Sequence, residues 1–113
     1  MADKKVKAVV FEGSAGYLRL LSGVPETKGM KAGYVVLQPG DSVGAHSTGA
    51  REEAIIILEG TLQVLAGGRP AMNAGKGELV YIPPQTDHDM KNTGAGAARY
   101  VYVVSPILQE AKC

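Results

Sequence analysis

The stretch PGDSVGAHSTGAREEAIIILEG, Pro39–Gly60, contains one of the two histidines of the chain and its clearest apolar strand pattern. Successive side chains of a strand point to opposite faces of the sheet. Glu53 therefore shares one face with Ile55 and Ile57, whereas Glu52 lies on the opposite face. Only one glutamate of this adjacent pair can point inward, and we expect it to be Glu53.

Short apolar runs surround this stretch, because fifteen glycines and six prolines divide the chain at close intervals. Runs of this kind predict strands joined by turns, and Gly60 allows a tight reversal between two of them. Helical periodicity is confined to residues 106–112. Many short strands predict an all-β fold, either a barrel or a two-sheet jelly roll. The expected strands are Lys7–Phe11, Tyr17–Leu21, Gly33–Gln38, Val43–His46, Ala54–Glu59, Thr61–Leu65, Leu79–Ile82, His88–Asn92 and Arg99–Val104.

The composition is that of an ordinary globular protein, with 45% apolar residues, 20% charged residues and a formal net charge of +1 over 113 residues. We expect one domain covering residues 1–113. The basic residues are scattered, which argues against a nucleic-acid partner. The longest apolar run is too short to cross a membrane, and no signal-peptide core is found at the start, so we expect a cytoplasmic protein without a membrane partner. The single cysteine, Cys113, is terminal and is not a candidate catalytic thiol.

The second histidine follows a rigid pair, Pro83 and Pro84, which fixes the chain direction before a strand that begins at His88. Met90 and Asn92 share the face of His88, so that Asp87 and Asp89 are expected to point to solvent. In a barrel, inward positions of different strands converge near one mouth. The residues with suitable chemistry for such a site are His46, Glu52 or Glu53, Asp87, His88 and Asp89, with Tyr34, Tyr81, Tyr100 and Tyr102 as hydrogen-bond donors.

The spacing of these residues resembles the two motifs of small single-domain cupins, and the matched region covers residues 40–92. The resemblance implies a single-domain cupin jelly-roll β-barrel, also called a double-stranded β-helix, and a homodimer formed through the outer sheet and the N-terminal strand. The first motif, G-x5-H-x-H-x(3,4)-E-x6-G, corresponds to Gly40, His46, Thr48, Glu53 and Gly60, with threonine in place of the second histidine. The second motif, G-x5-P-x-G-x2-H-x3-N, corresponds to Gly77, Pro83, Gln85, His88 and Asn92, with glutamine in place of the glycine.

The resemblance also implies a divalent metal ion held by His46, Glu53 and His88. A threonine hydroxyl is neutral and is a poor ligand, so Thr48 would offer only a weak or water-mediated contact. Two imidazoles and one carboxylate suit non-haem Fe(II) and are compatible with Mn, Ni, Co or Zn. The missing second histidine leaves either an open catalytic ion or a site that has lapsed.

Several functions are compatible with this pocket, because a fold does not fix a reaction. The first is a metal-dependent enzyme, with oxygenase chemistry as the leading expectation, that acts on a small and partly apolar organic molecule. The second is a non-catalytic module that binds a small ligand at a lapsed metal site, and the third is a metal-assisted isomerase or decarboxylase.

The last long strand supplies the remaining candidates for chemistry. Tyr100 and Tyr102 share one face, and the resemblance places that face in the barrel, where they would donate hydrogen bonds or act as a general acid. The alternative is that both tyrosines serve packing or a dimer interface. Arg51 is a candidate to receive a substrate carboxylate at the mouth, and the expected apolar lining is Val35, Leu37 and Met90.

Overall fold

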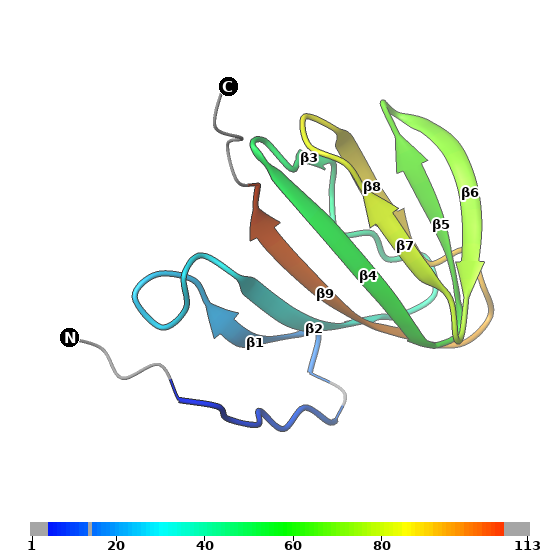
Figure 1. The fold of residues 1–113 in the computed structure, drawn as a ribbon. Coiled ribbons are helices and arrows are strands. Elements are labelled where there is room, and N and C mark those ends of the chain that lie inside the picture. Colours follow the sequence, from blue (N-terminus) through cyan, green and yellow to red (C-terminus); the bar gives the residue numbers. More distant parts are fainter. Residues whose placement is uncertain (1–4, 14, 108–113) are drawn as a thin grey trace.

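The computed structural model of the chain describes residues 5–13 and 15–107, which form strands and turns. The strands of this part of the chain lie in two sheets that face each other (Figure 1). One sheet has the order β1-β2-β9-β4-β7, and the other has the order β3-β8-β5-β6. The strands are β1 (Tyr17–Ser22), β2 (Lys31–Leu37), β3 (His46–Ser47), β4 (Arg51–Glu59), β5 (Thr61–Ala66), β6 (Arg69–Gly75), β7 (Leu79–Ile82), β8 (Asp87–Lys91) and β9 (Ala98–Pro106).

Strand β9 is the centre of the five-stranded sheet and sets the order of the side chains around it. Val104 pairs with Lys31 on β2 and with Glu53 on β4, so these three residues form one row across the sheet. Tyr102 forms the next row on the same face, between Gly33 and Ile55. Because alternate residues of a strand share a face, both rows point toward the four-stranded sheet.

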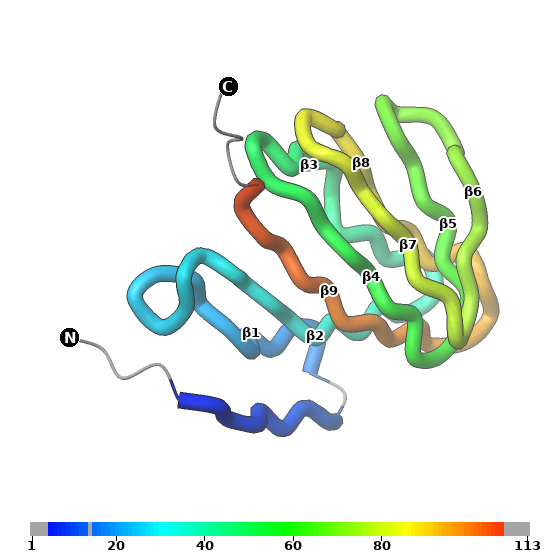
Figure 2. The backbone as a smooth tube through the Cα atoms, viewed as in Figure 1, coloured from blue at the N-terminus to red at the C-terminus, as the bar shows by residue number. Residues whose placement is uncertain are grey.

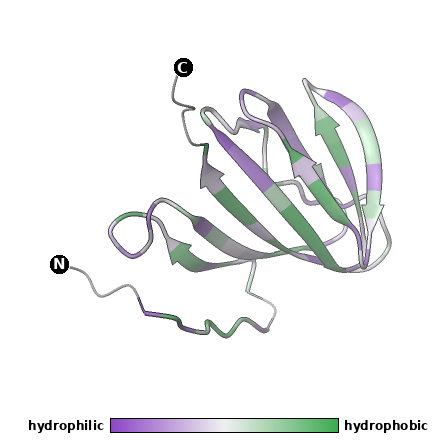
Figure 3. Ribbon diagram, viewed as in Figure 1, coloured by the Kyte–Doolittle hydropathy of each residue, from purple (hydrophilic) through white to green (hydrophobic). Residues whose placement is uncertain are grey.

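Apolar side chains from both sheets fill the space between them. Ile55 and Ile57 of β4 are each 1% exposed, and they pack in one cluster with Leu62 of β5 and Met90 of β8. Burial of each such side chain contributes about 1.5–3 kcal/mol to the stability of the fold. Figure 3 shows that β4 changes from hydrophilic at its start to hydrophobic along its middle, and the hydrophobic part contributes to this core.

Two motif residues have structural roles at one end of the sheets. Gly60, at the turn between β4 and β5, has a φ of 79°, and a Cβ added there would lie 2.8 Å from the carbonyl oxygen of Ala97. Only glycine satisfies both constraints without strain. Asn92 is fully buried, and its amide nitrogen donates to the carbonyl oxygens of Leu37 and Gly96 at 2.9 and 2.8 Å. The two residues therefore hold the turns that position the strands of the site.

The sequence predictions for most strands are confirmed, but four details are wrong. The predicted strand Val43–His46 is interrupted by Gly44, which has a φ of 94°, and β3 starts only at His46. No strand was expected at β6, because Pro70, Asn73 and Gly75 have low strand propensity. That strand lies at an edge of its sheet, where proline is tolerated. Of the predicted helical turn at residues 106–112, Pro106 instead ends β9, and residues 108–112 lie outside the described residues.

The fourth error concerns residues 7–11, which are described but do not form a strand. This segment runs beside the five-stranded sheet (Figure 2). It is fastened by side chains: Phe11 packs on the ring of Tyr34, and the Tyr34 hydroxyl donates to the carbonyl oxygen of Gly13 at 3.1 Å. In the part of the chain that the structure describes, no helix has the length and apolarity needed to cross a membrane.

Candidate metal centre

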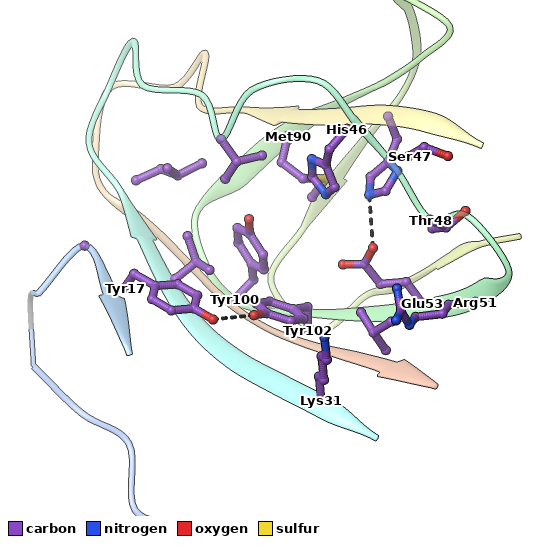
Figure 4. A pocket seen from close by; sticks show the side chains of 16 residues that line it. Tyr17, Lys31, His46, Ser47, Thr48, Arg51, Glu53, Met90, Tyr100 and Tyr102 are labelled. Atoms are coloured by element: carbon purple, nitrogen blue, oxygen red, sulfur yellow. Dashed lines mark hydrogen bonds and ion pairs between the residues drawn. The ribbon is translucent and has the colours of Figure 1, made fainter. Parts of the chain in front are cut away.

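A cavity of about 480 Å³ lies between the two sheets, and its walls are largely apolar. Both sheets contribute to it, with Val35, Leu37 and Val104 on one side and Met90 on the other. The expected lining residues are therefore confirmed. Figure 4 shows His46 and Glu53 at the same part of the cavity, and its dashed line at Glu53 marks the pair of this residue with His88.

The two histidines of the chain are direct partners in the antiparallel pairing of β3 and β8. Their ring centroids are 4.3 Å apart. Nδ1 of His46 lies 2.9 Å from the carbonyl oxygen of Gly44, and Nδ1 of His88 lies 3.1 Å from that of Thr86. A carbonyl oxygen can only accept, so each Nδ1 carries a proton and each neutral ring presents the lone pair of Nε2. Backbone contacts of this kind commonly orient metal-binding histidines.

Glu53 faces His88 across the cavity, and both side chains are buried. Oε1 of Glu53 lies 3.0 Å from Nε2 of His88, and the two side chains are 8% and 1% exposed. Apart from this contact with Glu53, Nε2 of His88 has no polar partner among the described residues. Two electron-rich atoms this close in a site shielded from water require a cation between them, either a proton or a metal ion.

The geometry of these donors fits a metal ion. Two ligand atoms that each lie about 2.1 Å from one ion, at right angles to each other, are about 3.0 Å apart. The separation of Glu53 Oε1 and His88 Nε2 matches this value. His46 supplies a third donor, and the donor atoms of all three residues lie within 4.8 Å of one another. His46, the exposed member of the set, would close the site from the solvent side.

In the metal-free protein, the neighbouring Glu53 carboxylate raises the pKa of His88 above its ordinary value, although burial of the ring acts in the opposite direction. A proton on His88 then neutralises the buried carboxylate. A metal ion must displace this proton, because only the neutral imidazole offers a lone pair.

The other acidic candidates lie outside this cluster. Glu52 points to the opposite face of β4, where its carboxylate accepts a hydrogen bond from the Tyr81 hydroxyl at 2.8 Å. The register expected for the pair of glutamates is therefore confirmed. Asp87 is exposed, and Asp89 is half-buried and accepts a hydrogen bond from the Gly44 amide at 3.0 Å. Asp89 thus orients the chain that leads into His46, a role that the sequence does not indicate.

Thr48 is buried and lines the cavity. Its hydroxyl donates to the carbonyl oxygen of Pro83 at 2.8 Å and accepts from the amide of Thr86 at 3.1 Å. These bonds tie the loop after β3 to the loop that precedes His88. The hydroxyl keeps one lone pair, so its weak or water-mediated contact with an ion stays a prediction.

Two of the four tyrosines expected as donors line the cavity, and two do not. Tyr100 is buried, and its hydroxyl end points into the cavity (Figure 4). The Tyr102 hydroxyl is hydrogen-bonded to that of Tyr17. Burial raises the pKa of both Tyr100 and Tyr102, so both remain protonated at neutral pH and act as donors rather than bases. Tyr34 and Tyr81 serve contacts outside the cavity.

Two cavity residues, Tyr17 and Lys31, were missed by the sequence analysis. Tyr17 pairs with Val35 across β1 and β2, and Lys31 begins β2 in the row that contains Glu53. The signal that identifies them is the register of β1, β2 and β9, which no local pattern of residues reveals.

The comparisons with known proteins agree with this architecture. The family model described as "Cupin domain" matches residues 33–104. "Polyketide synthase CurC" of Streptomyces cyaneus is 32% identical in an alignment of 96 residues that covers 81% of this chain and 60% of that protein. "Tetracenomycin polyketide synthase protein TcmJ" of Streptomyces glaucescens is 30% identical over 84% of this chain and 62% of its own length. The chain thus spans about three fifths of these relatives.

A solved structure supports the fold independently of these sequences. The cupin of Methanocaldococcus jannaschii described as having a double-stranded β-helix fold superposes with a TM-score of 0.72, with 19% identity and with 89% and 91% of the two chains covered. This likeness shows the fold alone. The family match covers more than half of the chain and includes both histidines and the inward glutamate. The chain belongs to the cupin family and has its double-stranded β-helix fold.

Proposed function

We infer that the protein is a metal-dependent enzyme that acts on a small, largely apolar molecule with two neighbouring oxygen atoms, with oxygenase chemistry as the leading reaction. The observation that carries this proposal is the buried pair of His88 and Glu53 in an apolar cavity, in which Nε2 of His88 lies 3.0 Å from Oε1 of Glu53 and has no other polar partner among the described residues. Strongly coupled titratable groups in such a cavity are typical of functional sites.

His46, Glu53 and His88 would hold a divalent ion, with Fe, Mn, Ni, Co and Zn all compatible with two imidazoles and one carboxylate. A bound ion would act as a Lewis acid toward substrate oxygens and, if it is redox-active, would also support reactions with oxygen. Tyr100 would direct its phenolic proton toward a substrate oxygen in the cavity.

The names of the two curated relatives point to a class of substrate. Both curated relatives are described as polyketide synthase proteins. Polyketide chains carry carbonyl groups on alternate carbon atoms, and a pair of such carbonyls forms an enolate whose two oxygens suit a divalent ion. The cavity offers an apolar surface for the carbon skeleton and its metal-binding cluster for the two oxygens. A 1,3-dicarbonyl compound or a phenol derived from one is therefore the preferred substrate.

The competing function is a non-catalytic module that binds the same kind of molecule. It is favoured by Thr48, whose hydroxyl holds two loops together at the position of the second motif histidine. A site with three protein donors retains an ion less firmly than one with four.

The experiment uses the full chain loaded in turn with Fe(II), Mn(II), Co(II), Ni(II) and Zn(II). Pentane-2,4-dione and 1-phenylbutane-1,3-dione serve as substrates, and dione loss and oxygen uptake are followed together. We expect turnover with at least one metal, loss of turnover in His88→Ala and normal turnover in Glu52→Gln. Dione loss without oxygen would assign isomerase or decarboxylase chemistry instead. If the protein binds the diones but no metal-loaded form turns them over, the enzyme proposal is overturned in favour of the binding module.

A further inference from the structure

A second hollow adjoins the main cavity at the end of the five-stranded sheet. It has a volume of about 400 Å³ and is formed by the turn after β1, the start of β2 and β4, and the end of β9. Lys28, Lys31 and Arg51 line it, and no acidic side chain does. Lys31 and Arg51 also line the main cavity, so the two hollows share one wall.

The strand register fixes where these cations lie relative to the metal cluster. Arg51 precedes Glu53 by two residues on β4, which places both on one face with their Cα atoms about 7 Å apart. Lys31 and Glu53 flank Val104 from opposite sides, so their Cα atoms are about 10 Å apart. Figure 4 shows Lys31 and Arg51 on the side of the cavity where Glu53 lies. The cationic side chains are therefore close enough to the three metal donors for one small, elongated molecule to reach both.

The three cations of this group, Lys28, Lys31 and Arg51, form no ion pair with a carboxylate of the described residues, 5–13 and 15–107. Glu26, in the turn after β1, is paired with Lys7 and accepts a hydrogen bond from the amide of Ser22. Three cations gathered in one hollow that no acidic side chain lines repel one another, and an anion placed among them relieves this repulsion.

We propose that Lys28, Lys31 and Arg51 bind the oxyanion group of an elongated ligand whose apolar body occupies the main cavity. The ligand class is an amphipathic organic anion, in which a carboxylate, sulfonate or phosphate stands at one end of a largely apolar skeleton. This inference rests on the proposed function insofar as the apolar body shares the cavity of the metal cluster. It adds a second point of attachment, which fixes the direction in which a substrate enters.

The test compares two compounds with the same apolar body, 4-phenylbutane-1-sulfonate and 4-phenylbutan-1-ol, by calorimetric titration of the full chain as purified. A sulfonate is a weak metal ligand, so its binding reports on the cations and not on the ion. We expect the sulfonate to bind about tenfold more tightly than the alcohol, which corresponds to two partly exposed charge contacts. This advantage shrinks in 0.5 M salt, because salt screens exposed charges.

The double variant Lys31→Gln/Arg51→Gln is expected to lose the tenfold advantage while its affinity for the alcohol is unchanged. The control is Lys76→Gln/Lys91→Gln, which removes the same charge from exposed positions outside both hollows. Thermal unfolding establishes that both variants fold. The proposal is overturned if the wild type binds the two compounds equally, if the Lys31/Arg51 variant keeps the advantage, or if the control variant loses it to the same extent. Metal content, measured in parallel, is expected to be equal in all three proteins, so failure of the metal site is distinguishable from failure of this proposal.

Discussion

The inner and outer faces of β4 place two adjacent glutamates in opposite surroundings. Glu53 is buried against His88 at the cavity, whereas Glu52 is half-buried and accepts a hydrogen bond from the exposed Tyr81. Both residues have the same side chain and the same backbone conformation. What differs is access to water. Water solvates the charged carboxylate of Glu52, whereas the buried carboxylate of Glu53 depends on a neighbouring cation. The chemistry of the site therefore comes from placement rather than from residue type.

The largest expected effect sets the two faces directly against each other. Glu53→Gln removes the only anionic donor of the His46, Glu53 and His88 cluster and is expected to weaken binding of Mn(II) about a hundredfold or more. Glu52→Gln removes the same charge one residue away and is expected to leave the dissociation constant unchanged. Competition titration against a coloured chelator measures both constants. Equal losses in the two variants would mean that overall charge, and not the inner cluster, attracts the ion.

The pH dependence of metal binding sharpens the same contrast. Glu53 raises the pKa of His88 above its ordinary value of 6.5. In the metal-free protein, protonation of His88 therefore contributes stability that is fully present below about pH 6.5 and is lost as pH rises through the raised pKa. The ion competes with this proton, so metal affinity is expected to fall about tenfold per pH unit once the pH is below the raised pKa.

The measurement is the dissociation constant of Mn(II) between pH 5.5 and 8.5 in the wild type and in Glu52→Gln. Both proteins are expected to give the same curve, with the decline starting above pH 6.5. An affinity that stays constant from pH 8.5 down to pH 5.5 would contradict the role assigned to His88.

A smaller effect is expected from the glycine that makes room for the inner tyrosines. A Cβ added at Gly33 would clash with the ring and hydroxyl of Tyr102. Gly33→Ala is therefore expected to lower the free energy of unfolding by about 1–3 kcal/mol, because the ring must move toward the cavity or toward Tyr17. Gly96→Ala is the control, since a Cβ there would meet no atom within 4 Å. Urea unfolding compares the two variants, and equal stabilities would show that the inner face tolerates the added methyl group.

The smallest effect is expected at an exposed position of the loop that leads to His88. Gln85 has a φ of 57°, a left-handed conformation that a residue with a side chain adopts only under strain. The cupin motif has glycine at this position. Gln85→Gly is expected to raise the free energy of unfolding by about 1 kcal/mol without changing metal affinity. A loss of stability would indicate that the Gln85 side chain makes a contribution larger than its backbone strain.

The sequence could predict those parts of the site that depend on local periodicity and motif spacing. Alternation along β4 was sufficient to separate Glu53 from Glu52, and the two motifs placed His46 and His88 together. The hydrogen bonds of Thr48 could not be predicted, because Pro83 and Thr86 are 35 and 38 residues away in the sequence and approach it only after folding.

Edge strands and long-range partners account for the other errors. β6 contains a proline and lies at an edge of the four-stranded sheet, where intrinsic strand propensity is a poor predictor of strand formation. Tyr17 and Lys31 enter the cavity through the register of β1 and β2 with β9, which is set by tertiary packing. The homodimer and the cytoplasmic location stay predictions.

The central claim is that His46, Glu53 and His88 form a metal site, and metal stoichiometry tests it most directly. The full chain is purified without an affinity tag or chelator and incubated with Fe(II), Mn(II), Co(II), Ni(II) or Zn(II). Unbound ions are then removed, and the bound metal is quantified by elemental mass spectrometry. We predict one equivalent of at least one of these ions per chain in the wild type and in Glu52→Gln, and none in His88→Ala. A wild-type protein that remains metal-free after incubation with every one of these ions would contradict the account.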